Sequence, residues 1–316
     1  MTKLFLYDNI ELIIQNKVSK KGYIMPLKKL QFPAIICVAL ITVIVIHRFS
    51  FGASGKEPAQ FTIVHLTDIH YTSAPPKTSP LTWKDHIRIL GYKLHTKNLA
   101  KCPQILQHTV EYINEKIKPD LVIVTGDMVD RGNDKEGMEQ AKDMLDKLNC
   151  TYYPVIGDHD LNSGLDKKKN YKDVFGKINY SFDYNEWHII MLGIYPDDSD
   201  LTWLQNDLDK NTDKPSILCL HRMLVASRLM KKLSKRYCPE IISPQTDKII
   251  KILNNHGRIK AVLSGHSHTN YMAKKGDIYY ISTACLIEIP YQFRVIKIYN
   301  NKISTSVKTA KPLKKR

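Results

Sequence analysis

The sequence predicts an α/β fold in which helices cover layered, at least partly parallel β-sheets. From residue 60 onward, short apolar runs alternate with amphipathic stretches of helical length. The region 278–307 then holds three more candidate strands with no helical stretch between them. Strands that alternate with helices and are followed by a strand-rich end are typical of an α/β layered domain. We find no internal repeat that would indicate a solenoid or a propeller instead.

In the first half of this region, apolar runs and helix breakers define the predicted elements. The largely apolar segment Phe61-Thr-Ile-Val-His-Leu66 predicts a buried strand. Apolar periodicity predicts a helix at 105–117 that Pro119 ends, and the run 121–124 predicts the next strand. A second helix is predicted at 135–148 and a third strand at 152–156.

The second half begins with a predicted β-hairpin. Segments 180–184 and 187–194 have the composition of strands and are joined at Asn185-Glu186. The remaining predicted elements are a short helix at 203–208, a strand at 217–220, a helix at 246–254, a strand at 259–263 and the three strands of the tail. A chain of 316 residues is long enough to bury a large core within one such domain.

The composition indicates the charge of the expected partner but not its chemical class. The formal net charge of +16 attracts polyanions such as nucleic acid, anionic lipid or phosphorylated substrates. We find no dedicated nucleic-acid-binding module, so nucleic acid is not an expected partner. The six cysteines form no CxxC pair and no zinc-finger spacing, so we predict neither a structural zinc site nor a disulfide framework.

Five of the predicted strands end in polar clusters. Because ligand sites form at the carboxyl ends of strands in open α/β sheets, we expect these clusters to converge. They contain four carboxylates and five imidazoles: Asp68, Asp127, Asp158 and Asp160, with His70, His159, His221, His266 and His268. Carboxylates at that density need cations among them. A donor set of Asp and His without Cys suits Mn, Fe or Zn in a reactive site.

The motif series resembles that of a known family. Asp68-x-His70, Gly126-Asp127, Gly157-x-His159, His221 and Gly265-His266-x-His268 resemble, in this order, the motifs of calcineurin-like metallophosphoesterases over residues 61–300. Thr202-Trp203-Leu204 followed by Leu208 is similar to the cyclic-nucleotide-phosphodiesterase-like members. The resemblance implies a four-layer α-β-β-α sandwich with two mixed sheets and a site for two divalent or trivalent metal ions.

The resemblance also implies a role for each motif residue. It implies that Asp68, His70 and His268 hold one metal, that Asp158, His221 and His266 hold the other, and that Asp127 bridges both. It implies that His159 faces the phosphate and serves the leaving oxygen rather than a metal.

Four further positions lie in the loops after the second and third predicted strands. Asp160 is expected to orient His159, as a carboxylate orients an imidazole in other enzymes. Arg131 has two readings of equal weight, a substrate contact implied by similarity to protein phosphatases and a solvent-facing side chain. Asp130 and Asp134 are interpreted as residues of a solvated loop, because turns often carry Asp.

Asp158 departs from the family pattern, which has Asn at this position. A carboxylate still ligates a metal through oxygen, but it lacks the N–H₂ donor of an amide. We therefore predict tighter metal binding and weaker phosphate binding than an Asn would provide.

These features predict hydrolysis of phosphoric mono- or diesters by a hydroxide that bridges two metals. Within that class, the alternatives are a cyclic nucleotide phosphodiesterase, a nucleotidase and a phospholipid-headgroup phosphatase. The alternative from another class is a catalytically silent protein that binds a phosphorylated ligand or serves as a scaffold at a membrane. Asp158 is the only residue that favours this alternative.

The N-terminal region predicts export or membrane anchoring. We divide the chain into a basic region at 1–31, an apolar segment at 32–46, a linker at 47–59, a catalytic domain at 60–310 and a basic tail at 311–316. The segment 32–46 is too short for a typical spanning helix and fits a signal-peptide core or a short anchor. We expect the catalytic domain on the extracytoplasmic side. Met25 is a candidate start, which would leave residues 1–24 untranslated.

Two basic amphipathic stretches, at 83–97 and 224–236, suggest contact with an anionic membrane or a lipid substrate. The other interpretation, which we favour, is a cap packed on its own domain with a solvated basic face.

Overall fold

The computed structural model describes residues 59–76, 88–89, 92–93, 97–228, 230–232, 241–300 and 302–310. All of them belong to one compact unit, Pro58–Arg316. The predicted apolar segment 32–46, the basic tail 311–316 and most of the stretch 83–97 lie outside the described residues.

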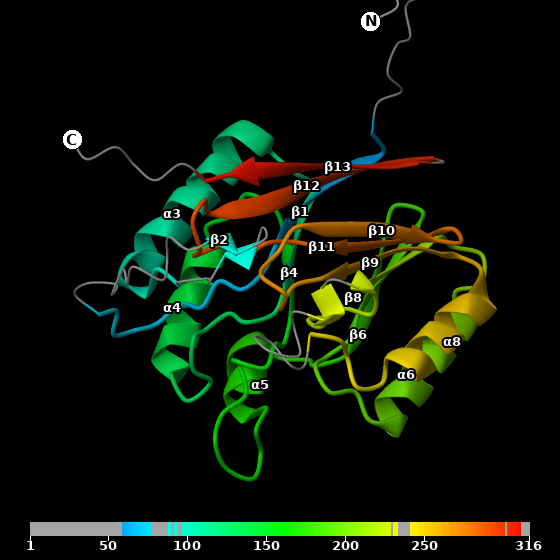
Figure 1. The fold of residues 1–316 in the computed structure, drawn as a ribbon, viewed down its shortest axis with the longest axis horizontal. Coiled ribbons are helices and arrows are strands. Elements are labelled where there is room, and N and C mark those ends of the chain that lie inside the picture. Colours follow the sequence, from blue (N-terminus) through cyan, green and yellow to red (C-terminus); the bar gives the residue numbers. More distant parts are fainter. Residues whose placement is uncertain are drawn as a thin grey trace, which may run out of the picture. The chain divides into compact units, whose positions relative to one another are not determined.

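Two mixed sheets form the centre of this unit (Figure 1). The strands of the first sheet, in spatial order, are β13 (Lys302–Thr309), β12 (Gln292–Tyr299), β1 (Phe61–Leu66), β4 (Leu121–Thr125) and β5 (Tyr152–Val155). Strands β1, β4 and β5 are parallel, and β12 is antiparallel to β1.

The second sheet has the same mixed character. Its order is β10 (Tyr271–Lys275), β11 (Ile278–Ser282), β9 (Ile259–Ser264), β8 (Ser216–Cys219), β7 (Trp187–Met191) and β6 (Tyr180–Tyr184). The four central strands are parallel, whereas β10 and β6 are antiparallel edge strands.

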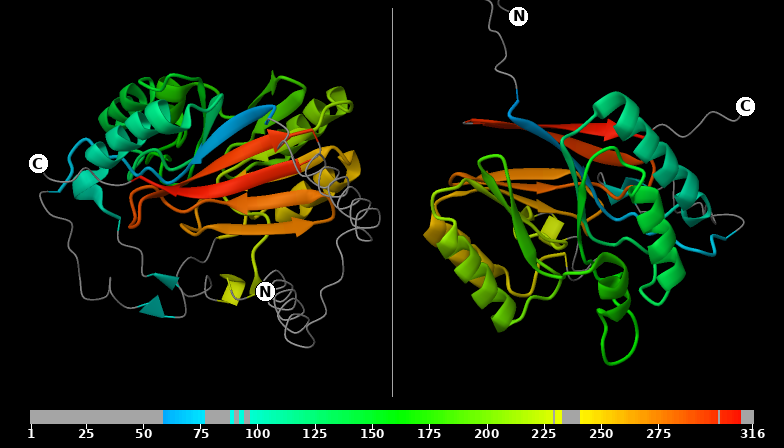
Figure 2. Two further views of the ribbon diagram at one scale, coloured as in Figure 1. Left: turned by 90° about the horizontal axis from the view of Figure 1, so that it is seen from above. Right: turned by 180° about the vertical axis from the view of Figure 1, so that it is seen from behind.

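Helices cover the outer face of each sheet (Figures 1 and 2). The first sheet is covered by α3 (Cys102–Tyr112) and α4 (Lys135–Leu145), with α5 (Lys169–Phe175) beside α4. The second sheet is covered by α6 (Asp198–Lys210) and α8 (Thr246–His256). This arrangement is the α-β-β-α sandwich implied by the motif series.

Strand β1 shows why the predicted strands have largely apolar sequences. Successive side chains of a strand point to opposite faces. Ile63 therefore belongs to the apolar cluster that also holds Ile123 and Leu263, while Val64 belongs to the cluster on the helix side that also holds Leu106. Both faces are buried, so the strand lacks a regular alternation of apolar and polar residues, although it includes Thr62 and His65.

Most predicted elements are confirmed, with four corrections. Helix α6 is twice as long as predicted because Asp197 and Asp200 form a capping box at its start. The sequence reading missed α5 and β10 entirely. The fourth correction concerns the stretch 83–97. Its helical spacing is not realised at the described positions, where Arg88–Ile89 (β2) pairs with Tyr92–Lys93 (β3) as short strands.

Two further predictions concern covalent links and membrane spans. The four described cysteines, Cys102, Cys150, Cys219 and Cys285, are free thiols. Among the described residues, no helix is both long enough and apolar enough to cross a bilayer.

Candidate metal centre

The carboxyl ends of five parallel strands carry the predicted ligands to one place. Asp68 and His70 follow β1, Asp127 follows β4, and Asp158 follows β5. From the second sheet, His221 follows β8, and His266 and His268 follow β9. The expectation that these strand ends converge is confirmed, because their donor atoms form two adjacent groups that could each hold a metal ion.

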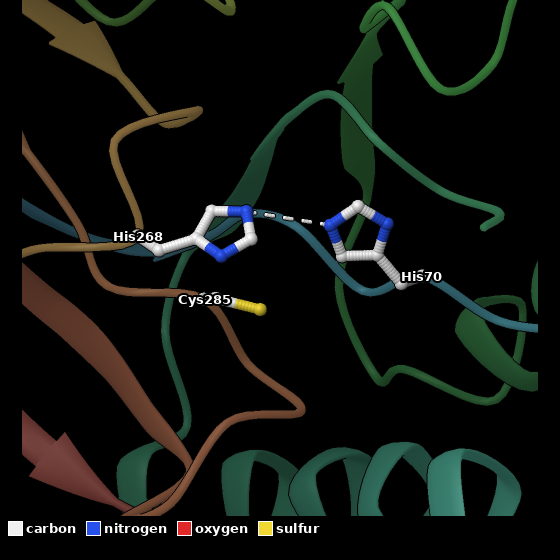
Figure 3. Close-up of side chains that lie close together, drawn as sticks. All are labelled: His70, His268 and Cys285. Carbon is white, nitrogen blue, oxygen red and sulfur yellow. Dashed lines mark hydrogen bonds between the residues drawn. The ribbon is translucent and has the colours of Figure 1, made fainter. Parts of the chain in front are cut away.

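The first group consists of Asp68, His70, Asp127 and His268. His268 Nε2 lies 3.1 Å from Asp68 Oδ1 and 3.5 Å from His70 Nε2. His70 Nε2 lies 3.6 Å from Asp127 Oδ2. Figure 3 shows the rings of His70 and His268 directed at each other, with the thiol of Cys285 beside them.

The second group consists of Asp127, Asp158, His221 and His266. Asp158 Oδ1 lies 3.0 Å from His221 Nε2 and 2.9 Å from His266 Nδ1. His221 Nε2 lies 3.4 Å from Asp127 Oδ2. Asp127 Oδ2 therefore faces imidazole nitrogens of both groups, which is the position of a bridging carboxylate.

The backbone at these ligand positions is strained. Five of the seven residues have a positive φ, between 43° and 60°: Asp68, His70, Asp127, His266 and His268. Each such residue costs on the order of 1–3 kcal/mol and persists only where its surroundings fix it. Strain concentrated at one cluster of side chains is characteristic of a functional site.

Close packing explains the glycine that precedes Asp158. A Cβ at Gly157 would stand 2.2 Å from Asp127 Oδ1 and 2.4 Å from the Asp127 amide nitrogen. Only glycine lets the loop after β5 lie this close to the loop after β4. The glycine of the Gly-x-His motif is thus required for the close packing of the two loops.

Two of the histidines are oriented by hydrogen bonds at the ring nitrogen that points away from the cluster. His221 Nδ1 donates to the carbonyl of Thr125 at 2.6 Å, and His268 Nδ1 donates to Glu288 Oε1 at 2.6 Å. Both contacts leave Nε2 directed into the cluster. A carbonyl or carboxylate partner of this kind fixes the tautomer and orientation of a metal-binding imidazole.

The charges of the cluster favour a cation. Burial by itself would raise the pKa of Asp68, but the imidazoles of His268, His221 and His70 outweigh it and hold that pKa well below its usual range. Burial would lower the pKa of His221, but Asp127 outweighs burial and raises it well above its usual value. Both shifts have the same cause, which is the attraction between the buried carboxylates and positive charge.

The donor atoms themselves fit metal ions. Within the described part of the chain, the buried oxygens Asp68 Oδ1 and Asp158 Oδ1 have no hydrogen bond, although imidazole nitrogens lie about 3 Å from each. A buried carboxylate oxygen without a donor is costly. Oxygen and nitrogen lone pairs that converge without a hydrogen bond suit a shared cation, and the Asp/His composition suits Mn, Fe or Zn.

His159 stands beside the two groups. Its backbone N–H donates to Asp127 Oδ1 at 2.9 Å, and its ring meets the ring of His70 at 4.6 Å between centroids. Its Nδ1 donates to the carbonyl of Asp130 at 2.7 Å, which leaves Nε2 as the ring nitrogen without that proton.

The expected role of Asp160 is wrong. This buried carboxylate accepts hydrogen bonds from Val129 N–H at 3.1 Å and Gly157 N–H at 2.8 Å. The backbone carbonyl of Asp130, and not Asp160, orients the imidazole of His159. Asp160 therefore joins the loops after β4 and β5 instead of acting on the catalytic candidate.

Comparisons with known proteins agree with this geometry. A family profile described as calcineurin-like phosphoesterase matches residues 61–270. The chain belongs to the calcineurin-like phosphoesterase family. It is 26% identical over 168 residues to a probable cyclic nucleotide phosphodiesterase of Synechococcus, a match that covers 50% of this chain and 61% of that protein. It is 25% identical to a probable glycerophosphodiester phosphodiesterase of Arcobacter nitrofigilis, over 58% of this chain and 68% of that protein.

A solved structure shows the same fold. A dimetal phosphatase from Danio rerio superimposes with a TM-score of 0.62 at 12% identity, over 80% of this chain and 97% of that one. At this identity, the likeness establishes the calcineurin-like phosphoesterase fold alone.

Two site residues of this calcineurin-like phosphoesterase were missed from sequence, and one was misread. Glu288 lies between β11 and β12, where no motif marks it. Lys97 was read as part of a basic helix face. Asp130 was interpreted as a solvated loop residue, but its carboxylate is 18% exposed and lies 2.9 Å from Lys97 Nζ and 3.6 Å from His70 Nδ1.

Arg131 and Asp134 complete the loop after β4. Arg131 is exposed and lines a surface hollow together with Asp158 and His159. Asp134 is not a solvated loop residue, because it caps α4 by accepting from Gly137 N–H and also accepts from Ser73. The basic stretch 224–236 is described only in part, and its described residues Leu224, Val225 and Met230 are buried.

Proposed function

We propose that this protein hydrolyses phosphoric esters with the help of two metal ions. The observation that carries the proposal is the sharing of Asp127 Oδ2 between two groups of Asp and His donors. A pair of cations held by one carboxylate is the arrangement used for in-line displacement at phosphorus. Membership of the calcineurin-like phosphoesterase family supports the same reaction class.

Seven side chains would hold the metals. One ion would be held by Asp68, His70 and His268, the other by Asp158, His221 and His266, with Asp127 shared. When bound, two such ions acidify a shared water and neutralise the phosphoryl oxygens. Among Mn, Fe and Zn, the donor set favours none.

The residues of the chain contribute orientation and proton transfer. Thr125 and Glu288 fix the rings of His221 and His268. His159 lines the same hollow as Asp158 and Arg131, where the imidazolium form of its ring would supply a proton or a positive charge to the leaving oxygen. Arg131 is a candidate contact for the remote part of a substrate.

Phosphodiesters are the substrate class that the relatives favour. The printed names of the Synechococcus and Arcobacter proteins describe diesterases of cyclic nucleotides and of glycerophosphodiesters. The hollow beside His159 is open to solvent, which leaves space for the second substituent of a diester. Cyclic nucleotides are the candidate substrates among diesters, and nucleotides and phospholipid headgroups remain the candidates among monoesters.

The test is hydrolysis of p-nitrophenyl phosphate and bis(p-nitrophenyl) phosphate by protein loaded with Mn²⁺, Fe²⁺ or Zn²⁺. We expect turnover that disappears after chelation and returns with metal, faster on the diester. No hydrolysis of either ester with any of the three metals would instead support the silent phospho-ligand binder. Metal analysis of the purified protein, with two ions per chain expected, separates a failure of loading from a failure of catalysis.

We further propose that residues 32–46 export or anchor the protein and place the catalytic domain outside the cytoplasm. The uncharged apolar run between Lys29 and His47 supports this proposal. Fractionation of cells that express the native chain tests it, and N-terminal sequencing shows whether residues 1–24 are present and whether cleavage occurs. Recovery of the intact chain in the cytosol would contradict export and anchoring alike.

A further inference from the structure

Lys97 lies directly beside the proposed catalytic histidine. Its Nζ is 3.3 Å from His159 Nε2 and 2.9 Å from Asp130 Oδ1. Because the Asp130 carbonyl occupies His159 Nδ1, Nε2 is the ring nitrogen that meets the lysine. One ammonium group therefore touches both members of the His159–Asp130 pair.

The backbone beside Lys97 is held in place. The N–H of Asn98 donates to the carbonyl of Ile287 at 3.0 Å, and the side chain of Asn98 donates to Tyr291 at 2.6 Å. These contacts tie the lysine to the segment that also carries Glu288, behind His268. The lysine side chain itself is 22% exposed, so its ammonium is positioned and still reaches solvent.

The local charge balance calls for a cation that donates hydrogen bonds. Asp158 is an acceptor only, so its side chain supplies no N–H to a phosphoryl oxygen. Asp130 adds another carboxylate close to His70, at 3.6 Å. Each of these carboxylates repels an incoming phosphate. A lysine ammonium has three donors, of which Asp130 and His159 use two.

We infer that Lys97 binds a phosphoryl oxygen of the substrate and supplies the donor that Asp158 lacks. This inference deepens the proposed function and rests on it for the identity of the ligand. In this arrangement His159 and Lys97 form one wall of the phosphate site, opposite the metal ligands. The charge of Lys97 favours more highly charged phosphates, so it matters more for a dianionic monoester than for a monoanionic diester.

The experiment compares Lys97→Met with Lys97→Arg and with Lys101→Met in protein saturated with Mn²⁺. Lys101 is an exposed lysine of the adjacent 3₁₀ turn and lies outside the site, which makes it the matched control. The probe is inorganic phosphate, titrated by calorimetry. Metal content, melting temperature and steady-state kinetics on p-nitrophenyl phosphate and its bis ester are measured in parallel.

We expect Lys97→Met to weaken phosphate binding about ten- to a hundredfold, the loss of one charge-assisted hydrogen bond. Metal content stays at the wild-type value. The KM for the monoester rises more than the KM for the diester. Lys97→Arg keeps most of the phosphate affinity, because it keeps the charge and the donors. Lys101→Met behaves as wild type.

A double variant separates substrate binding from a purely structural ion pair. If Lys97 offsets the charge of Asp158, then Asp158→Asn restores much of the phosphate affinity that Lys97→Met loses, and the two effects are not additive. A structural Lys97–Asp130 pair would instead show itself as a lower melting temperature with unchanged phosphate binding.

A failure of the inference about Lys97 and a failure of the proposed hydrolase give different results. Equal phosphate affinity in Lys97→Met and Lys101→Met overturns the inference about Lys97, whatever the wild type hydrolyses. Absence of ester hydrolysis by the wild type, together with phosphate binding that depends on Lys97, overturns the proposed hydrolase and leaves the phosphate site standing.

Discussion

The Nδ1 atom of His268 lies 2.6 Å from Oε1 of Glu288, twenty residues further along the chain, and both side chains are largely shielded from solvent. The carboxylate holds the imidazole with Nε2 toward Asp68 and raises its basicity as a ligand. Glu288 thus supports a candidate metal ligand through the far side of its ring, and no motif in the sequence marks this glutamate.

Replacement of Glu288 tests this arrangement. We expect Glu288→Ala to weaken binding of one metal ion about ten- to a hundredfold, since loss of such a partner typically costs that much. Metal titration of the apoprotein measures it. Glu111→Ala, on the exposed side of α3, is the control. Two equally tight metals in Glu288→Ala would contradict the role we assign.

His159 is expected to act on the substrate and not on the metals. We predict that His159→Ala lowers kcat about a hundred- to ten-thousandfold, the usual contribution of a general acid. Metal content is expected to stay at the wild-type value, because His159 lies outside the two donor groups that share Asp127. The result is read from steady-state kinetics and metal analysis, with His108→Ala on α3 as the control. Loss of metal in His159→Ala would show that it is a ligand.

The substitution Asp158→Asn replaces a negatively charged carboxylate by a neutral amide that can donate hydrogen bonds. We expect weaker metal binding, because a neutral amide oxygen replaces a carboxylate oxygen 2.9–3.0 Å from two imidazole nitrogens. We also expect tighter inhibition by inorganic phosphate at saturating Mn²⁺, because the amide donates. Inhibition assays at fixed metal measure the second effect. The account is wrong if, at saturating Mn²⁺, the variant loses turnover and inorganic phosphate inhibits it no more strongly than the wild type.

Asp160 is expected to matter for stability. Asp160→Ala leaves the buried N–H groups of Val129 and Gly157 without their acceptor, at a cost of about 1–3 kcal/mol for each group. Urea denaturation should therefore show a free energy of unfolding lower by a few kcal/mol. A variant of wild-type stability that has lost only kcat would restore the idea that Asp160 serves His159.

A buried histidine outside the two donor groups, His188, predicts a pH dependence of stability. Burial would lower the pKa of His188, but hydrogen bonds to Asp207 at 2.7 Å and Asp183 at 2.8 Å outweigh burial and raise it. The folded pKa then exceeds the unfolded value of about 6.5, so this stabilisation is complete below about pH 6.5 and is lost as pH rises through the folded pKa.

The comparison of wild type with His188→Gln measures that pH dependence. We expect the free energy of unfolding to differ by about 1.5–3 kcal/mol at pH 5.5, the range for hydrogen bonds to charged groups, and by less at pH 8.5. Urea denaturation across this range gives the difference. A gap that widens as pH rises would reverse the sign we assign.

The sequence by itself determined the alternation of buried strands and helices and the placement of Asp and His at strand ends. Largely apolar segments such as Phe61–Leu66 indicate strands that are buried on both faces. The parallel arrangement of these strands brings their carboxyl ends together. For this reason the seven members of the two donor groups could be named before any coordinates were known.

Only the tertiary structure decided what surrounds those donors. Glu288 and Lys97 meet His268 and His159 across separations of 20 and 62 residues, from segments without periodicity or motif. Asp160 was misassigned because adjacency in sequence does not tell which way a side chain points at a strand end. Contacts made by loops depend on packing of the whole sandwich, and local residue patterns carry no record of that packing.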